Sequence, residues 1–316
     1  MRMGTGSGIR SYKGARRQNI REKGGCYDIY AGNERLKVQV NSRGGELWSV
    51  QTKDGHEYLW QGDKKYWQDR ALNLFPYIAR LTEGKYVLDG KTYEMSIHGF
   101  VNFSELEAEE QTDTRLTLKL SDSEETRRMY PFAFTYRLIY ELTENKIHVT
   151  FAVENKDSRT MYFGVGGHPG FMVPMEEETS FEDYCLQFDG NKNPVRVGFS
   201  EDCFVNGQDN EFILDDGKLP LSHDMFNQDA IVLRDMAKSV TLHSAKGTRA
   251  VRVAYPQMDY LGIWHMPFTD APYVCIEPWS SLPSRKGMVE NLAEQPGLVH
   301  LPAGENYENR WSIEII

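Results

Sequence analysis

The sequence lacks any uninterrupted apolar run of about 18 residues, the length at which a helix can span a membrane. It also lacks the apolar segment that follows the basic residues of a secretory signal peptide. The first absence excludes a helical membrane protein and the second argues against secretion. We therefore expect a cytoplasmic protein with no membrane partner.

Cysteine is scarce and forms no motif. Cys26, Cys185, Cys203 and Cys275 are far apart, and none belongs to a Cys-x-x-Cys or Cys/His zinc pattern. Isolated thiols of this kind are typical of the reducing cytosol, where they stay unpaired and mostly buried. The pattern predicts free thiols and no metal site.

Positive charge is in deficit, since 36 Lys and Arg stand against 46 Asp and Glu and the formal net charge is -10. An acidic surface repels a phosphate backbone, so nucleic acid is not expected as a partner. The exception is residues 1–24, which are basic, rich in Gly and Ser, and poor in large apolar residues. This composition predicts a disordered segment. The alternative is a basic arm for a nucleic acid or a membrane.

Amphipathic helical patterns of about 10–15 residues are missing between the strand-like segments, which argues against a βαβ architecture. The sequence is instead rich in strand and turn formers, with 12% aromatic residues and 27 glycines. Residues 115–120 alternate with a clean period of two. Gly44-Gly45 predicts one turn, and residues 143–145 predict a hairpin. Further strands are expected at residues 36–40, 46–52, 134–142, 146–153, 230–233, 239–244, 249–254 and 310–316.

Strands of this length and spacing predict an all-β protein whose antiparallel sheets form a sandwich or a barrel. Short helices are expected at most at residues 221–226 and 288–294. No internal repeat and no linker divides residues 25–316. We therefore expect one domain over residues 25–316.

Two histidines lie beside glycines at the edge of apolar runs. His98 precedes Gly99, and His168 lies in residues 164–171, which contain four glycines and a proline. Glycine lets the backbone approach another group closely, and an imidazole titrates near neutral pH. Each histidine is a candidate for proton transfer or ligand binding. The alternative for each is a turn residue whose ring bonds to the backbone.

A single acid interrupts the apolar segment 273–279. Burying Glu277 is costly unless its carboxylate is paired or has a function. Pro278 cannot donate to a ladder, which predicts that the strand ends at or near Glu277, beside the ring of Trp279. The alternative is a buried glutamate paired with an arginine. One carboxylate, two histidines and many aromatic rings together favour acid–base chemistry on a small polar molecule such as a carbohydrate.

Four short motifs follow one another along the chain: Pro76-Tyr77-Ile78-Ala79-Arg80, Ile97-His98-Gly99-Phe100, Gly166-Gly167-His168-Pro169-Gly170-Phe171 and Cys275-Ile276-Glu277-Pro278-Trp279. In this order and spacing they closely resemble the aldose 1-epimerase (galactose mutarotase-like) family, in particular its LacX-like branch. The resemblance extends over residues 26–316. Each motif alone is weak, whereas four in order are specific.

The resemblance implies a large antiparallel β-sandwich of the galactose mutarotase type, a supersandwich, with the sugar in an open cleft on one sheet. It implies that Glu277 takes the proton of the anomeric hydroxyl and that His168 protonates the ring oxygen. His98 would bind the sugar near the ring oxygen, and Arg80 would bind a ring hydroxyl. This chemistry needs neither a cofactor nor a metal.

Three further substrate-binding residues are expected on the same grounds. Asp229 resembles the hydroxyl-binding aspartate of the family, and Trp279 could stack on the apolar face of the sugar. Trp264 lies where an aromatic ring could form the cleft floor, although it could equally be a core residue. The expected partner is a small sugar, and the expected oligomeric state is a monomer or a weak homodimer.

Two other functions remain open. A mutarotase for a hexose phosphate would need additional cations near the cleft, for which Arg80, Arg285 and Lys286 are candidates. A non-catalytic carbohydrate-binding module could keep the cleft without turnover. The presence of both His168 and Glu277 disfavours such a module, because binding alone needs no matched acid and base.

Overall fold

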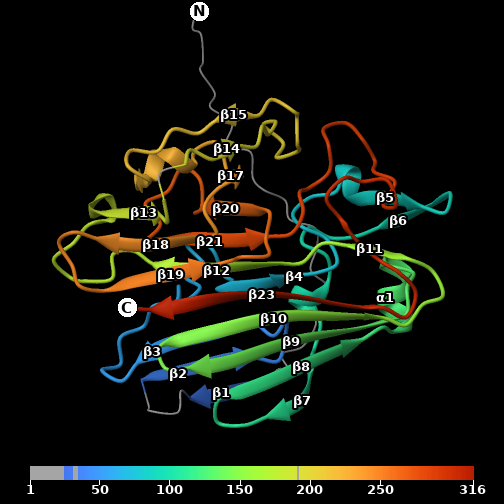
Figure 1. Ribbon diagram of the computed structural model, residues 1–316, viewed down its shortest axis with the longest axis horizontal. Helices are drawn as coiled ribbons and strands as arrows, with labels where there is room; N and C mark the ends of the chain where they lie inside the picture. Colours follow the sequence, from blue (N-terminus) through green and yellow to red (C-terminus); the bar gives the residue numbers. More distant parts are fainter. Residues whose placement is uncertain (1–24, 31–34, 191) are drawn as a thin grey trace, which may run out of the picture.

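A computed structural model describes residues 25–30, 35–190 and 192–316. The predicted disordered segment, residues 1–24, lies outside the described residues. The architecture is two stacked antiparallel layers with short connections (Figure 1), which confirms the predicted all-β sandwich.

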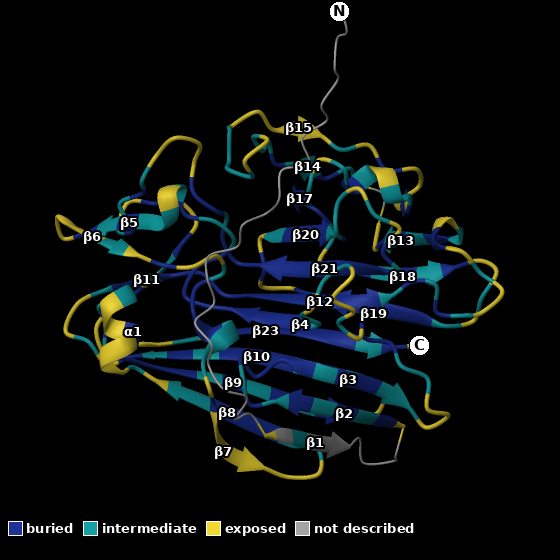
Figure 2. Ribbon diagram, turned by 180° about the vertical axis from the view of Figure 1, so that it is seen from behind, coloured by how far each residue is buried: buried dark blue, intermediate teal, exposed yellow. Residues whose placement is uncertain are grey.

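The larger layer is a sheet of nine strands, in which the predicted hairpin 134–153 occupies a central position. In spatial order the strands are β16 (Lys218–Pro220), β13 (Tyr184–Phe188), β18 (Ser239–Ser244), β19 (Ala250–Ala254), β23 (Asn306–Ile315), β10 (Lys146–Asn155), β9 (Phe134–Thr143), β8 (Arg115–Ser121) and β7 (Glu107–Gln111). The edge strand β7 is exposed throughout and carries three glutamates (Figure 2), a composition that opposes edge-to-edge association.

The second layer is a sheet of seven strands. In spatial order they are β15 (Asn210–Glu211), β14 (Val195–Arg196), β17 (Ile231–Arg234), β20 (Tyr260–Trp264), β21 (Tyr273–Trp279), β12 (Gly166–Met172) and β4 (Ala71–Leu74). The central strands β21 and β12 are buried almost completely (Figure 2). This sheet therefore provides a protected surface at its middle.

Smaller sheets complete the layers. They are β1 (Cys26–Tyr30) with β2 (Leu36–Asn41) and β3 (Leu47–Thr52), β5 (Lys85–Leu88) with β6 (Lys91–Glu94), and β11 (Met161–Phe163) with β22 (Val299–Leu301). The turn predicted at Gly44-Gly45 is present, with both residues at positive φ. That conformation is readily available to glycine and costly for other residues.

The core lies between the layers because side chains alternate in direction along each strand. Leu138, Val149 and Ile313 project from the nine-stranded sheet, and Ile263 and Ile276 from the seven-stranded sheet, and all five are fully buried in one apolar cluster. Each such side chain stabilises the fold by about 1.5–3 kcal/mol. The side chains that alternate with Ile263 on β20 and with Ile276 on β21 consequently point away from the core.

Helices are few in the described parts of the chain, as expected, but their positions differ from those predicted. Residues 221–226 contain only the 3-10 turn η4 (His223–Phe226). Residues 288–294 contain no helix, because Glu290 and Leu292 bond to the backbone of Val87 in β5 instead. The other short turns are η1 (Thr82–Gly84), η2 (Val101–Phe103) and η3 (Phe181–Asp183).

One α-helix, α1 (Glu124–Met129), escaped the sequence prediction. Ser123 caps it, accepting the backbone N–H of Thr126 at 3.2 Å while the Thr126 hydroxyl accepts the N–H of Ser123 at 2.8 Å. The helix is too short to show an apolar period. Over the described residues, no helix has the length and apolar character needed to cross a membrane.

Candidate active site

A cleft of about 480 Å³ opens on the outward face of the seven-stranded sheet, over its central strands. All seven residues that the sequence singles out line this one cleft. They are Arg80, His98, His168, Asp229, Trp264, Glu277 and Trp279. They come from β12, β20, β21 and the connecting loops, so the fold brings together positions that are far apart in the chain.

His168 and Glu277 face each other across β12 and β21. The register pairs Gly166 with Trp279 and Gly170 with Cys275, which places His168 opposite Glu277 midway between these pairs. The His168 Nε2 atom lies 3.2 Å from the Glu277 Oε2 atom. Neighbouring strands therefore hold a candidate acid and base at contact distance.

The strand β21 ends near Glu277, as predicted, but it first continues through Pro278 to Trp279. The reason lies in the interrupted ladder between β12 and β21, which has no residue pairs between Gly166 and Gly170. Pro278 lies opposite this gap, where its missing N–H breaks no bond to β12. The strand can therefore continue past Pro278, and Glu277 lies within the sheet rather than at its end.

The glycines of β12 leave room for two tryptophans. A Cβ atom on Gly166 would lie 2.9 Å from Trp279 on the cleft side, and one on Gly167 would lie 2.5 Å from Trp311 on the core side. Both distances are shorter than normal carbon contacts. The glycine density around His168 thus reflects close packing on both faces of the strand.

Burial controls the charge of the acid–base pair. Only 1% of Glu277 is exposed, and this burial, followed by the nearby charge of Asp229, raises its pKa well above 4.5. Burial also lowers the pKa of His168 below 6.5. Each shift favours the neutral form. The pair consequently holds one proton over a wide pH range.

Several polar atoms in the cleft have no hydrogen-bond partner among the described residues. They are His168 Nδ1, Glu277 Oε2, Trp279 Nε1 and Asn102 Oδ1, all buried. Buried polar groups are normally satisfied, because an unmade hydrogen bond costs about 1–3 kcal/mol. A cluster of unsatisfied donors and acceptors in one cleft points to a polar ligand.

Aromatic rings surround the His168 imidazole. Trp67 is tilted by 32° against it, with ring centroids 4.8 Å apart, and Trp264 meets it edge-on at 5.6 Å. Trp264 is half-buried and lines the cleft, so it is not a core residue. The rings fix the orientation of the imidazole and give the cleft apolar walls beside its polar floor.

His98 has a defined tautomer. Its ring Nδ1 accepts the backbone N–H of Ala79 at 3.2 Å. The backbone N–H of His98 in turn donates to the Ala79 carbonyl. Burial, together with the charges of His168 and Arg80, holds the pKa of His98 well below 6.5. A neutral imidazole whose Nδ1 accepts must carry its proton on Nε2. His98 is therefore a hydrogen-bond donor through Nε2.

Asp229 is held by two contacts at the rim. Its Oδ1 accepts the backbone N–H of Ala230 at 2.8 Å, and its Oδ2 accepts the thiol of Cys203 at 3.1 Å. Burial and the Asp229 charge raise the pKa of Cys203 to about 12, so the thiol stays protonated and donates. Asp229 has a positive φ of 71°, a strained conformation common at functional sites.

Only one of the three cations considered for a sugar phosphate lines the cleft, namely Arg80. Arg285 instead forms an ion pair with Glu290, its Nη2 lying 2.8 Å from Oε2. Lys286 is exposed and does not line the cleft. Arg80 shares this lining with Asp69, Asp229 and Glu277, of which burial keeps Glu277 neutral. This balance does not suit a doubly charged phosphate.

Possible metal ligands occur together once in the part of the chain that the structure describes. Ligand atoms of His168, Cys275 and Glu277 lie within 4.8 Å of one another, although no metal site was expected. Burial raises the pKa of the Cys275 thiol well above 9, and that of Glu277 is raised as well. Metals bind the deprotonated forms of these groups. The environment therefore disfavours a resident ion.

Sequence reasoning missed several residues of the cleft, and Trp67 and Cys203 are the two that contact predicted site residues most directly. Trp67 lies in a polar loop, and the adjacent aromatics Tyr66-Trp67 among charged residues were an available signal. Cys203 was expected to be an ordinary buried thiol, and no local pattern connects it with Asp229. Cys203 and Cys185 are half-buried and Cys275 is buried, and all three are free.

Comparisons with known proteins identify the family and the fold. The sequence model of the aldose 1-epimerase family matches residues 27–314. The plasmid form of protein LacX from Lactococcus lactis subsp. lactis is 31% identical over 293 residues, which cover 90% of this chain and 98% of that protein. A solved galactose mutarotase related enzyme from Lactobacillus acidophilus is 32% identical, with a TM-score of 0.88 and coverage of 92% and 97% of the two chains. A galactose mutarotase-like protein from Lactobacillus casei is 31% identical, with a TM-score of 0.87 and coverage of 92% and 100%.

Proposed function

Since the chain belongs to the aldose 1-epimerase family, we propose that it is a mutarotase that interconverts the α and β anomers of an aldohexose. The observation that carries this proposal is the opposition of His168 and Glu277, with Nε2 and Oε2 3.2 Å apart in a buried cleft. Anomer exchange needs one group that removes a proton and one that supplies it. A paired imidazole and carboxyl meet that need.

The proposed reaction proceeds by ring opening. Glu277 takes the proton of the anomeric hydroxyl while His168 gives a proton to the ring oxygen, so that the C1–O5 bond breaks and an open aldehyde forms. Rotation about C1–C2 and reclosure with the two roles reversed give the other anomer. Each proton transfer contributes about 10²–10⁴-fold.

A single shared proton supports this exchange. Burial favours the neutral acid and neutral imidazole in the empty cleft. With that one proton on the imidazole instead of the carboxyl group, the pair is the carboxylate and imidazolium that the proposed roles require, and their nearest atoms, Oε2 and Nε2, lie 3.2 Å apart. Because ring opening and reclosure each take one proton from the sugar and return one to it, the pair holds one proton throughout and the enzyme returns to its starting state.

The remaining residues bind and orient the sugar. His98 donates through Nε2 near the ring oxygen, where negative charge develops as the ring opens. Arg80 and Asp229 bind ring hydroxyls, and the rings of Trp264 and Trp279 pack on the apolar face of the sugar. With one guanidinium beside two aspartates and a neutral Glu277 at the cleft, the expected substrate is a neutral hexose rather than a hexose phosphate.

The test is polarimetry of freshly dissolved α-D-glucose, α-D-galactose and their 6-phosphates. We expect wild-type protein to accelerate at least one neutral hexose in proportion to enzyme concentration. Glu277→Gln, purified in the same way, reports any contaminating mutarotase. Acceleration of the phosphates alone would reassign the substrate class, and wild-type rates equal to buffer for every sugar would show that the proposal is wrong.

Calorimetry distinguishes a mutarotase from a non-catalytic carbohydrate-binding module. A non-catalytic carbohydrate-binding module would bind one of these sugars and leave its rate of anomer exchange at the buffer value. A mutarotase binds weakly and turns over.

A further inference from the structure

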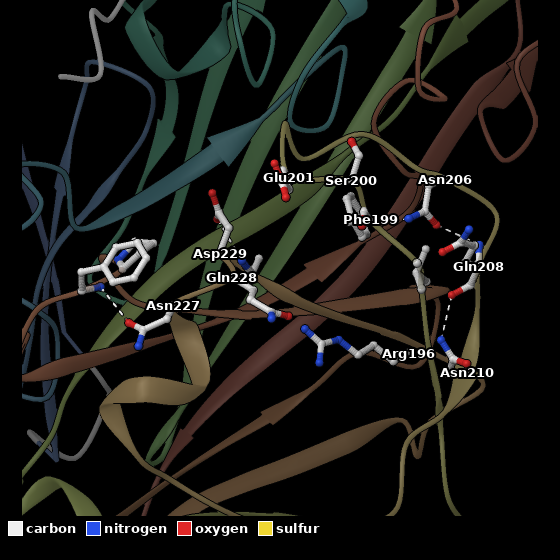
Figure 3. Close-up of a pocket in the computed structure, with 15 residues that line it drawn as sticks. Arg196, Phe199, Ser200, Glu201, Asn206, Gln208, Asn210, Asn227, Gln228 and Asp229 are labelled. Atoms are coloured by element: carbon white, nitrogen blue, oxygen red, sulfur yellow. Dashed lines mark hydrogen bonds between the residues drawn. The ribbon is translucent and has the colours of Figure 1, made fainter. Parts of the chain in front are cut away.

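A second cavity of about 580 Å³ adjoins the catalytic cleft (Figure 3). Both hollows are bounded by Phe199, Pro267 and the run from Gln228 to Ala230. Asp229, the proposed hydroxyl-binding residue, therefore stands at their common boundary. A hexose in the cleft would leave the second cavity unfilled, since each hollow alone lies within the range of about 300–1,000 Å³ typical of a ligand site.

The second cavity has a polar lining in which some groups are fixed and others are free. Asn206 donates through Nδ2 to the Phe199 carbonyl at 2.9 Å, and Asn210 donates to the Gln208 carbonyl at 2.9 Å. The side chains of Arg196 and Gln228 make no hydrogen bond or ion pair with any described residue. Figure 3 shows these two side chains pointing toward one another. They offer several donors and one acceptor to a ligand.

Phe268 supplies an exposed aromatic surface beside this lining. Its side chain is 80% exposed, which is unusual for a large apolar residue, and its φ of 58° is strained. The Asn227 side chain holds it in place by accepting its backbone N–H at 3.1 Å. A strained, exposed ring held by a polar clamp suggests a functional constraint rather than packing.

The charges around the second cavity disfavour an anion. Arg196 is accompanied by Glu201 and Asp229, so acids outnumber bases in the lining. Side-chain amides, one guanidinium and an exposed ring match the hydroxyls and apolar face of a neutral sugar. We propose that this second cavity binds the next sugar unit of a reducing oligosaccharide whose terminal aldose lies in the catalytic cleft.

This inference rests on the proposed mutarotase function and deepens it. The glycosidic bond to the second sugar unit would be attached at the position of the terminal aldose that faces Asp229. Binding of the second unit would hold the reacting ring against His168 and Glu277. Binding energy from a remote part of a substrate can raise the rate at the reacting centre.

The experiment compares monosaccharides with reducing disaccharides. Anomer exchange of glucose, galactose, maltose, cellobiose, isomaltose and lactose is followed by NMR with the full chain. We expect kcat/KM for at least one disaccharide to exceed that for its reducing-end monosaccharide by about tenfold, the scale of one good pocket contact. Disaccharide values at or below the monosaccharide values throughout the panel would overturn the proposal.

Variants outside the catalytic cleft locate the effect. Arg196 and Phe268 do not line the catalytic cleft. Arg196→Ala and Phe268→Ala should lower kcat/KM for the favoured disaccharide to the value for its monosaccharide and leave glucose turnover unchanged. Arg128→Ala on α1 and Ile213→Ala are matched controls, since both side chains are exposed and neither lines the cavity. A loss confined to glucose 6-phosphate in Arg196→Ala would instead identify an anion site and overturn the proposal.

Calorimetry with the same disaccharides separates the two hypotheses. If no sugar is turned over but a disaccharide binds and Arg196→Ala weakens that binding, the mutarotase function is wrong and the second subsite stands. If monosaccharides are turned over and no disaccharide is favoured in binding or rate, the function stands and the subsite is wrong.

Discussion

Two buried glutamates, in different regions of the molecule, illustrate how a structural acid differs from a functional one. Glu290 lies in the loop after β21 and is fully buried, yet its carboxylate accepts the backbone N–H of Arg285 at 2.9 Å and two guanidinium bonds at 3.0 and 2.8 Å. Glu277 on β21 is just as buried, but its Oε2 has only the neighbouring His168 nitrogen, outside hydrogen-bond geometry.

Burial of a carboxyl group alone therefore does not mark an active site. The sequence leaves two readings open for Glu277, a functional acid or a buried glutamate paired with an arginine, and the second arrangement is found at Glu290. A satisfied carboxylate stabilises a loop, whereas an unsatisfied one keeps its bonding capacity for a ligand.

The largest expected effect comes from exchanging the two acids for amides. Glu277→Gln should lower anomer exchange by about 10²–10⁴-fold, since it removes the base. It should leave the fold intact, because a neutral amide avoids the cost of burying charge. Glu290→Gln should keep the wild-type rate of anomer exchange. Polarimetry and thermal unfolding of both variants test this, and equal losses of rate would contradict the distinction.

His168→Asn should reduce the rate by a similar factor, about 10²–10⁴-fold, and the pH profile of the wild type sharpens the assignment. With the pKa of His168 lowered and that of Glu277 raised, the pair gains its second proton only well below pH 6.5 and loses its last proton only well above pH 4.5. The plot of kcat/KM against pH should therefore show no acid limb from an ordinary histidine. A limb with the ordinary histidine pKa of about 6.5 would contradict the shared proton.

Glu46, a third buried acid, predicts how stability depends on pH. Burial raises its pKa from 4.5 to about 7, although its Oε1 accepts the backbone N–H groups of Arg70 and Ala71. The native state holds this proton more tightly than the unfolded chain. The contribution of Glu46 to stability should therefore be fully present below pH 4.5 and fall by about 3 kcal/mol as pH rises through 7.

Glu46→Gln should remove that fall and leave mutarotation unchanged, because Glu46 lies outside the cleft. Urea unfolding of both proteins between pH 4 and pH 8 measures the difference. Parallel curves would show that Glu46 titrates normally.

The smallest effect is expected at the Arg285–Glu290 pair. Arg285→Ala should destabilise the fold by about 1–3 kcal/mol, because it leaves the Glu290 carboxylate buried with only a backbone donor. Water reaches the half-exposed guanidinium site, which limits the loss. Urea unfolding gives the free-energy change. A simultaneous fall in turnover would show that this loop also acts on the cleft.

Much of the fold could be predicted from residue patterns. The strands expected at 36–40, 115–120, 134–142 and 239–244 occur within a residue of their predicted ends. The last strand begins at Asn306 rather than at residue 310. Its extra residues pair with β10, a tertiary contact that local alternation does not reveal.

The errors have related causes. A helix was expected at 288–294, where apolar spacing permits one, but Val87 pairs with that backbone. The helix α1 was missed because its signal is a cap at Ser123, with no apolar period.

The sequence by itself determined the all-β class, most strand positions and the identity of the main cleft residues, because strand alternation and short motifs are local properties. Only the tertiary structure decided that Glu277 faces His168 at 3.2 Å, that Ala79 sets the His98 tautomer, and that a second cavity begins at Asp229. These features depend on register between distant strands and on competition for backbone partners, which no single segment of the chain specifies.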